Sequence, residues 1–373
     1  MNLETLQFRI AITLINGIGN NLAKNLIAYL GSEEAVFKEN KKTLSQIPGI
    51  GTTLAKEISN HKDALLRAEK EIEFIQKNKI QYLYYGDKNY PFRLKECPDA
   101  PLILFTKTPL NLNEGKFISI VGTRNATHYG KDNCRQFIKE LAAIPNLHII
   151  SGLAYGIDIC AHRAALDNDI PTIGVVAHGL DRIYPGIHRT TAVRMLERGG
   201  LVTEYLSDTN PDRQNFVQRN RIVAGLSDAL IVVESAQKGG ALITAGLAND
   251  YNREVFAFPG RTNDELSVGC NNLIKYNRAT LINDAQDFMR FMSWDIEKPK
   301  KKSVQTELFT DLSDIEMQIF TAIRKHPEGM DVNELAISQS ISYAKLTALL
   351  LALEFKGLLK CLPGNKYKAS LPD

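Results

Sequence analysis

Cysteine is scarce in this sequence: five residues are spread over 373 positions, namely Cys97, Cys134, Cys160, Cys270 and Cys361. No two of them form a CxxC pair, so neither a zinc knuckle nor a dithiol redox site is indicated. No apolar run approaches the ~18 residues that a membrane-spanning helix needs, and the first residues lack the basic-then-apolar pattern of a signal peptide. We therefore expect a cytoplasmic protein with reduced thiols and no membrane partner.

An excess of charge of either sign is also missing. Lysine and arginine total 45, aspartate and glutamate total 42, and the formal net charge is +3. This balance excludes a uniform basic coat, whereas a local basic patch remains compatible with it. With 44% hydrophobic and 23% charged residues, the chain is expected to fold into about two to three globular domains.

Sequence motifs for catalysis and cofactor binding are few. There is no Walker A lysine motif and no dinucleotide GxGxxG, so an ATPase or a dehydrogenase is not indicated and no cofactor is expected. The seven histidines show no HxxxH spacing, which leaves no expected metal site. Asp158 and His162 lie four residues apart on one predicted helix face and could pair; a hydrogen-bonded pair that fixes a turn is favoured over a catalytic dyad. We expect no catalytic residues and no enzymatic activity.

The first 75 residues contain an internal repeat. INGIGNNLAK, residues 15–24, and IPGIGTTLAK, residues 47–56, each place a Gly-Ile-Gly turn between helical patterns, as in a helix–hairpin–helix unit. Glycines let the backbone approach a phosphate, and the N–H groups at the start of the next helix point at that anion. Possible contacts with a DNA backbone in this helical domain are therefore Gly17, Gly19, Lys24, Gly49, Gly51 and Lys56. A tight turn in a small interaction module is the alternative.

Between residues 76 and 295, short apolar runs alternate with helical patterns, as expected for βαβ units on a parallel sheet. Strands are predicted at 117–121, 148–150, 172–176, 201–204, 229–233, 255–258 and 280–282, and helices near 131–143, 157–167, 190–198, 220–226, 241–251 and 285–292. Residues 82–106 are expected to form an extension packed on the sheet edge. The predicted fold class is α/β, with a doubly wound, Rossmann-like parallel sheet.

Residues 296–312 are predicted to be a linker, whose charged run Lys298-Pro-Lys-Lys-Lys302 is typical of a solvated tether. Residues 313–373 show three helical patterns and a hairpin, the outline of a winged-helix domain. The third helical pattern, 342–355, is rich in leucine and offers one basic side chain, Lys345. Because a DNA-reading helix needs several polar or basic side chains, a packing or partner-binding role is favoured for this domain.

Two predicted strand ends carry glycine-rich turns, at 121–130 and 151–158. The carboxyl ends of parallel strands are where such sheets bind ligands. Gly122, Thr123 and Arg124 combine close backbone approach, a hydroxyl and a forked cation, all suited to a phosphate. Gly152 brings a second turn to the same edge. These turns by themselves do not distinguish a cofactor, a nucleotide and a polynucleotide.

The stretch RQNFVQRNR, residues 213–221, surrounds one phenylalanine with three arginines. Cations that follow a phosphate backbone, beside an aromatic ring that stacks a base, are the arrangement that holds single strands. We therefore assign a nucleic-acid site to Arg213, Phe216, Arg219, Asn220 and Arg221. The alternative is that Phe216 fills the core while the arginines form salt bridges on a helix.

The sequence resembles the DNA-processing protein A family (DprA, also called Smf) at these and neighbouring motifs. The matching stretches are VGTR at 121–124, SGLAYGID at 151–158, YP at 184–185, Phe216 with RNRI at 219–222, GALITA at 240–245 and VFAFPG at 255–260. Their order agrees across the central domain. The flanking domains are similar too, to a sterile-alpha-motif-like helical domain before it and a winged helix after it.

The resemblance implies a recombination mediator that binds single-stranded DNA in an extended Rossmann domain, without being an enzyme. It implies protection of incoming DNA in natural transformation, a homodimer, loading of the RecA recombinase and a contact with single-strand-binding protein. The implied pocket uses Arg124, Arg213, Phe216, Arg219 and Arg221, with backbone amides at Gly122 and Gly152 on phosphates. The family usually has Ser-Gly-Ser where Gly239-Gly240-Ala241 stands, so two hydroxyls are absent, at positions 239 and 241, while backbone N–H donors remain.

Two other functions stay open. Nucleotide-processing enzymes of the phosphoribohydrolase type share related Rossmann folds, but their Pro-Gly-Gly-x-Gly-Thr loop is replaced here by Lys238-Gly-Gly-Ala-Leu-Ile243. A transcription regulator that acts through the winged helix is the second alternative.

Overall fold

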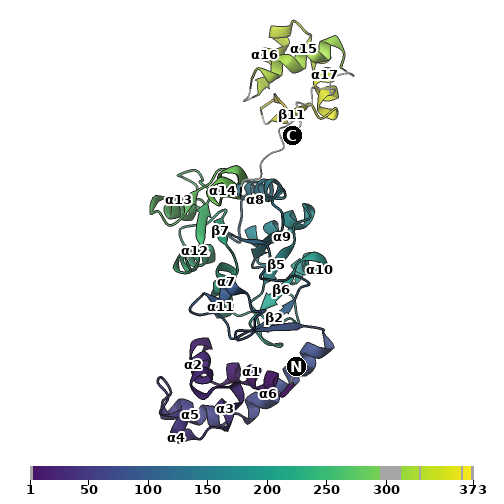
Figure 1. Ribbon diagram of the computed structural model, residues 1–373. Coiled ribbons are helices and arrows are strands. Elements are labelled where there is room, and N and C mark those ends of the chain that lie inside the picture. The colour runs from purple at the N-terminus through teal and green to yellow at the C-terminus, as the bar shows by residue number, and fades with distance from the viewer. Residues whose placement is uncertain (1–2, 295–311, 327–328, 363, 371–373) are drawn as a thin grey trace. The chain divides into compact units, whose positions relative to one another are not determined.

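The structure is a computed structural model that describes residues 3–294, 312–326, 329–362 and 364–370. The chain forms two compact units, which divide after residue 296. The predicted linker, 296–312, falls at this division, and its run Lys298-Pro-Lys-Lys-Lys302 lies outside the described residues. Each unit is considered by itself below (Figure 1).

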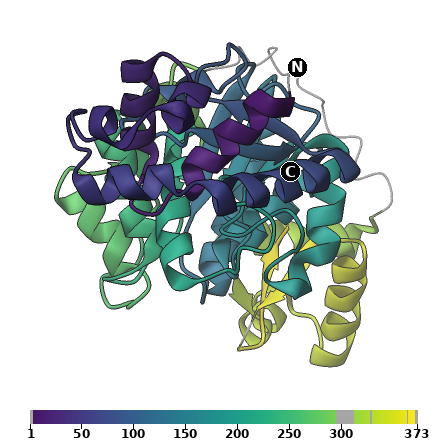
Figure 2. The ribbon, with the colours of Figure 1, turned by 90° about the horizontal axis from the view of Figure 1, so that it is seen from below.

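Six helices fold residues 3–77 into a helical layer, drawn in purple to blue in Figure 2. They are α1 (Leu3–Leu14), α2 (Asn20–Leu30), α3 (Glu33–Lys38), α4 (Lys41–Leu44), α5 (Thr52–Ser59) and α6 (Lys62–Lys77). The two repeat turns need glycine, since Gly17 and Gly49 adopt φ values of 82° and 85°. A Cβ at Gly17 would lie 2.7 Å from Leu54 of the second copy, and one at Gly49 would lie 3.3 Å from Leu22 of the first. The repeat in the sequence is therefore also a paired contact in the fold.

A nine-stranded sheet forms the centre of the first unit, in the order β1-β2-β6-β5-β4-β3-β7-β8-β9. The strands are β1 (Gln81–Tyr84), β2 (Ile103–Lys107), β3 (Lys116–Val121), β4 (Leu147–Ser151), β5 (Thr172–Val175), β6 (Gly200–Thr203), β7 (Ala229–Val232), β8 (Glu254–Ala257) and β9 (Thr280–Leu281). The pairings from β6 through β9 are parallel, while β2 pairs antiparallel with both β1 and β6. The predicted doubly wound Rossmann-like sheet and its edge extension are confirmed.

Helices cover both faces of this sheet. They are α7 (Phe92–Lys95), α8 (His128–Leu141), α9 (Ile157–Asp167), α10 (Arg189–Arg198), α11 (Arg213–Gly225), α12 (Gly240–Asp250), α13 (Val268–Lys275) and α14 (Ala285–Phe291). Alternate side chains of β3 enter two separate cores: Phe117 and Val121 pack with residues of α11 and α12, and Ile118 and Ile120 pack with residues of α8, α9 and α14. The strand C-termini therefore open between two helical layers.

The helical layer and the sheet edge share one apolar core. Tyr84 of β1 and Ile103 and Phe105 of β2 belong to the same buried cluster as Ile10, Leu26 and other residues of the first helices. A buried polar contact adds to it, because the Glu71 carboxylate of α6 accepts hydrogen bonds from the backbone and hydroxyl of Ser207, at 3.0 and 2.5 Å. The predicted helical domain is therefore continuous with the sheet in its packing.

The second unit contains three helices and a small sheet. The helices are α15 (Asp314–Arg324), α16 (Val332–Gln339) and α17 (Tyr343–Phe355), and the strands β10 (Met330–Asp331), β11 (Leu359–Leu362) and β12 (Lys366–Ala369) pair antiparallel. A capping box between Ser313 and Glu316 begins α15. This is the predicted winged-helix outline.

Within the described ranges, no single helix is long and apolar enough to cross a membrane. One bent pair, α16 with α17, meets the length and composition criteria only when its two helices are taken together.

Candidate nucleic-acid interface

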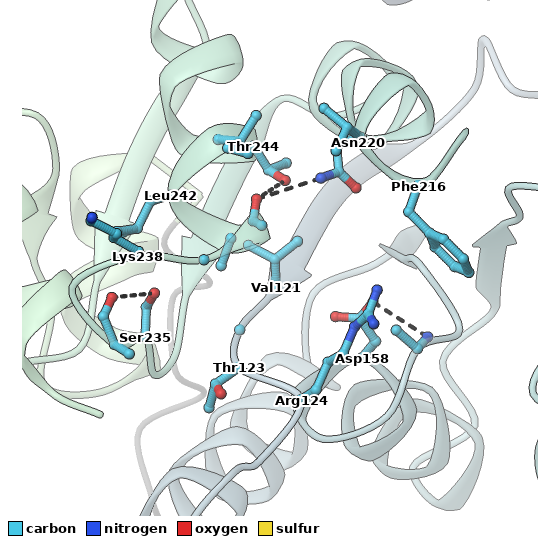
Figure 3. Close-up of a pocket in the computed structure, with 18 of the residues that line it drawn as sticks. Val121, Thr123, Arg124, Asp158, Phe216, Asn220, Ser235, Lys238, Leu242 and Thr244 are labelled. Carbon is cyan, nitrogen blue, oxygen red and sulfur yellow. Dashed lines mark hydrogen bonds between the residues drawn. The ribbon is translucent and has the colours of Figure 1, made fainter. Parts of the chain in front are cut away.

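A pocket of about 820 Å³ opens at the carboxyl ends of β3, β4 and β7 (Figure 3). Its walls come from the loops that follow those strands, from α11, and from the first turns of α9 and α12. The lining includes Gly122, Thr123, Arg124, Ala154, Asp158, Arg213, Phe216, Arg219, Asn220, Lys238, Gly239, Gly240 and Thr244. The sequence assigned ten residues of the central domain to DNA binding, and eight of them line the pocket. Of the other two, Gly152 lies in the turn behind the pocket, against Arg219, and Arg221 does not line it.

The exposed cation and the aromatic ring of this pocket lie against each other. The guanidinium of Arg124 lies 5.1 Å from the centroid of the Phe216 ring, and the two side chains approach each other in Figure 3. Tyr184 contributes a second ring, tilted, at 5.9 Å from that of Phe216. Arg124 is exposed and Phe216 is half-buried. A base can therefore reach the ring while its phosphate reaches the guanidinium, which is the geometry of single-strand binding.

Arg219 lies on the floor of the pocket rather than on its surface. It is 3% exposed, and its Nη1 donates to the carbonyl oxygen of Val175 at 2.6 Å. Burial raises the pKa of the Asp158 carboxyl and the charge of Arg219 opposes that rise. Burial likewise lowers the pKa of Arg219, and Asp158 opposes this change. Each charge thus compensates the other in a low-dielectric position.

Gly152 has a steric function beside this guanidinium. A Cβ at residue 152 would overlap the terminal nitrogens of Arg219, so only glycine allows the arginine its position. The sequence assigned Gly152 to backbone contact with phosphate; the structure shows that it makes room for a buried cation.

Arg221 turns away from the pocket, whereas Arg213 lines it. The guanidinium of Arg221 forms an ion pair with Glu204 and donates to the carbonyl oxygen of Asp99, on the other side of α11. Arg213 is exposed at the first turn of the helix. Because nine residues of one helix point in all directions, the three arginines occupy three different environments.

Glu234 fixes the loop that carries Arg124. Its carboxylate accepts from the hydroxyl of Thr127 at 2.6 Å and from the Thr127 amide at 2.8 Å, and its carbonyl accepts from the Thr123 amide at 2.8 Å. Gly122 lies in this crowded turn, where a Cβ would come within 3.0 Å of the Glu234 carbonyl and closer still to Ile157. The loop is therefore held before any ligand arrives.

Lys238 is a pocket residue that the sequence reasoning did not assign. It lies in the exposed turn after β7, and Figure 3 shows it across the pocket from Phe216. The signal was present in the sequence, as a lysine directly before Gly239 and Gly240. The amides at the start of α12 lie beside it, and the first amides of a helix lack intrahelical partners.

The expected pairing of Asp158 with His162 does not occur. The Asp158 carboxylate accepts from the Ala154 amide at 3.4 Å, and His162 Nδ1 lies 2.7 Å from the hydroxyl of Thr172. The prediction was wrong because β5 offers His162 a partner that helix periodicity cannot reveal. In the part of the chain that the structure describes, no group of three His, Cys, Asp or Glu side chains is placed to hold a metal.

The two repeat turns of the helical layer differ in what lies against them. In the first copy, Asn20 Oδ1 accepts from the Leu102 amide at 2.9 Å, and Lys24 Nζ lies 4.1 Å from the centroid of the Tyr85 ring. Burial lowers the pKa of Lys24. Gly17 and Gly19 of the first copy are exposed, as are Gly49, Gly51 and Lys56 of the second. The structure does not bring either turn into the pocket at the strand ends.

Together, the fold and the pocket define a class: Rossmann-like proteins with a pocket at the carboxyl ends of the strands, the edge at which such sheets bind ligands. Residues 81–293 match the family model described as DNA recombination-mediator protein A, and residues 8–60 match that of a SAM-like helix-hairpin-helix tandem.

Comparison with individual proteins supports the same family. The chain is 30% identical to protein Smf of Synechocystis sp., covering 96% of this chain and 97% of that protein, and 40% identical to DNA processing protein DprA of Bacillus subtilis, covering 62% and 75%. Among solved structures, DprA of Streptococcus pneumoniae superposes with a TM-score of 0.64 at 31% identity, over 78% of this chain and 97% of that one. DprA of Helicobacter pylori, whose structure is described as showing a single-stranded DNA binding mode, superposes with a TM-score of 0.52 at 30% identity, over 58% and 96%. The chain belongs to the DprA/Smf family of DNA-processing recombination mediators.

Proposed function

We propose that the protein binds single-stranded DNA in the pocket at the strand ends. The observation that carries the proposal is the exposed guanidinium of Arg124 against the half-buried ring of Phe216, in a pocket of about 820 Å³. Duplex DNA keeps its bases stacked inside, so a ring within a pocket favours a strand whose bases are free. The single-stranded DNA binding mode described for the Helicobacter pylori relative supports the same choice.

Each pocket residue has its own part in this proposal. Arg124 and Arg213 contact phosphates beside Phe216, and Lys238 contacts a phosphate from the facing loop. Backbone amides at Thr123 and at the start of α12, near Gly240, supply further donors. Asn220, whose side-chain amide nitrogen lies 3.5 Å from the Gly240 carbonyl oxygen, joins the two walls.

Arg219 and Arg221 act differently from the surface cations. Arg219 contributes its positive field from below the pocket, because it is buried beside Asp158. Arg221 holds α11 to the sheet edge through Glu204. We therefore assign direct phosphate contact to neither.

The resemblance to the family supports a wider proposal. The protein acts in the cytoplasm as a homodimer that protects incoming single strands, contacts single-strand-binding protein and loads the RecA recombinase. It does so without catalysis. The winged helix has little part in this DNA binding, since the exposed positions of α17 include Tyr343, Leu351 and Phe355 and one basic side chain, Lys345.

A gel-shift comparison of single-stranded and duplex DNA tests the proposal. We expect the wild-type chain to retain the single strand preferentially and Arg124→Ala to release it, while Arg198→Ala, an exposed arginine of α10 outside the pocket, behaves as wild type. Equal retention by Arg124→Ala and wild type contradicts the pocket assignment. Release of a free base from nucleoside monophosphates favours the phosphoribohydrolase alternative, and loss of binding on deleting residues 296–373 favours the winged-helix alternative.

A further inference from the structure

A second basic pocket lies directly beside the first, between α8 and α9. It has a volume of about 600 Å³, and four cationic side chains line it: Arg124, Lys131, Arg135 and Arg163. Arg124 belongs to both pockets. No local sequence pattern marks the other three, because they are spread over two helices.

The partition between the two pockets is the turn after β4. Ala154 faces the first pocket, whereas Tyr155 and Gly156 face the second. This turn is tied to the Arg124 loop, since the Ile157 amide donates to the Thr123 carbonyl at 3.2 Å. Gly156, at φ 79°, packs so closely on the same loop that a Cβ would overlap it. The two pockets are therefore compartments of one fixed surface, with Arg124 at the passage between them.

Positive charge dominates the second pocket. Its one acidic side chain, Asp167, pairs with Arg194 of α10 at 3.2 Å. Arg135 pairs with Asp132 at 2.7 Å, and both side chains are more than half exposed, so this ion pair is weak and yields readily to a phosphate. Arg163 is exposed and donates from Nε to the Thr191 hydroxyl at 3.3 Å.

The second pocket also offers an aromatic ring. Tyr155 is 48% exposed, and its ring and that of His188 form an edge-to-face contact with centroids 5.1 Å apart. An exposed ring among cations repeats the combination found at Phe216 in the first pocket. Base stacking on such rings is tolerant of sequence.

We propose that the bound single strand continues from the first pocket over Arg124 into the second. There Lys131, Arg135 and Arg163 contact phosphates and Tyr155 stacks a base. This inference rests on the proposed function, and it extends the DNA site to the surface of α8 and α9. It predicts that a strand must be long enough to fill both compartments to reach full affinity.

The test measures affinity against oligonucleotide length for two variants. Arg135→Gln/Arg163→Gln removes two cations from the second pocket, and Lys107→Gln/Arg198→Gln removes two exposed cations that line neither pocket. Oligo(dT) strands of increasing length are titrated by fluorescence anisotropy at several salt concentrations.

For long strands, we expect Arg135→Gln/Arg163→Gln to lose roughly ten-fold in affinity and its salt slope to fall by about 1.4, since each phosphate contact on a single strand contributes about 0.7. For the shortest strands that bind, the two variants should match. Equal affinity of the two variants for long strands overturns the second pocket. If that happens while Arg124→Ala abolishes binding, the proposed function stands without this extension; if the wild type binds no strand, both fail.

Discussion

The first hairpin of the helical layer and the pocket at the strand ends begin with similar chemistry and end in different states. Both place glycines before a helix N-terminus and a basic side chain close by. In the hairpin, Asn20 contacts Leu102 and Lys24 contacts Tyr85, and both partners lie in the segment between the edge strands β1 and β2. In the pocket, Arg124 stays exposed beside Phe216.

This difference shows how much a glycine-rich motif predicts. The motif predicts a backbone that turns tightly and exposes its amides. Whether those amides meet a ligand or a neighbouring element depends on tertiary packing. In the second hairpin Gly49, Gly51 and Lys56 are all exposed. The comparison therefore predicts that DNA affinity depends on the pocket, and fold stability on the first hairpin.

The largest expected effect is that of Arg124→Ala. A hydrogen bond to a charged group contributes about 1.5–3 kcal/mol, so we expect affinity for single-stranded DNA to fall by roughly 10- to 100-fold. Thermal unfolding should change little, since the side chain is exposed. Anisotropy titration checks the affinity; Arg198→Ala serves as the matched control.

Phe216→Ala tests the aromatic half of the pocket. Stacking of one base contributes about 1–3 kcal/mol, and we expect a loss of roughly 5- to 100-fold. Phe216→Trp keeps a stacking surface and should restore most of the affinity. If the alanine and tryptophan variants bind alike, the ring does not stack a base.

Gly152→Ala tests the steric function of this glycine. The added methyl group displaces the Arg219 guanidinium, and overpacking of this kind costs about 1–3 kcal/mol. We expect a lower free energy of unfolding in urea together with weaker DNA binding. Gly246→Ala, where a Cβ meets nothing within 4 Å, is the control and should be at least as stable as wild type.

Asn20→Ala tests the packing role of the first hairpin. Loss of the hydrogen bond from the Leu102 amide should lower the free energy of unfolding by about 1 kcal/mol. DNA affinity should stay within about two-fold, because binding at the pocket does not involve this residue. If Asn20→Ala weakens DNA binding without lowering the free energy of unfolding, the packing role assigned to the first hairpin is contradicted.

The smallest expected effect is that of Gly240→Ser. A Cβ at this position has its nearest neighbour at 3.6 Å, the side-chain nitrogen of Asn220, so the residue fits. The added hydroxyl provides one more donor for a phosphate, and we expect affinity to rise by about two- to five-fold. Unchanged or reduced affinity in the same titration places the strand away from the start of α12.

Much of the fold could be predicted because its signals are local. The apolar runs at 117–121 and 229–233 became β3 and β7 within one residue at either end. The start of α11 was missed: the predicted helix began at residue 220, whereas the helix begins at Arg213. The stretch from Arg213 to Arg221 has one phenylalanine and one valine among polar side chains, too few to show a helical period.

The sequence predicted which residues line the site better than it predicted how they are arranged. Residue types and their positions at strand ends predicted that Arg124 and Phe216 belong to the site, and both line the pocket. The burial of Arg219 could not be predicted, because it depends on Gly152 and Asp158, which are more than 60 residues away in the chain. The pairing of Arg221 with Glu204 and the docking of Asn20 on Leu102 likewise depend on contacts between distant segments.

One measurement tests the central claim most directly: a titration of a labelled single strand and of its duplex with the wild-type chain over a range of salt concentrations. We predict affinity at least roughly ten-fold higher for the single strand, with an affinity that falls linearly against the logarithm of salt concentration. Equal or tighter binding of the duplex would contradict the claim that this pocket holds a strand by an exposed arginine and a stacking ring.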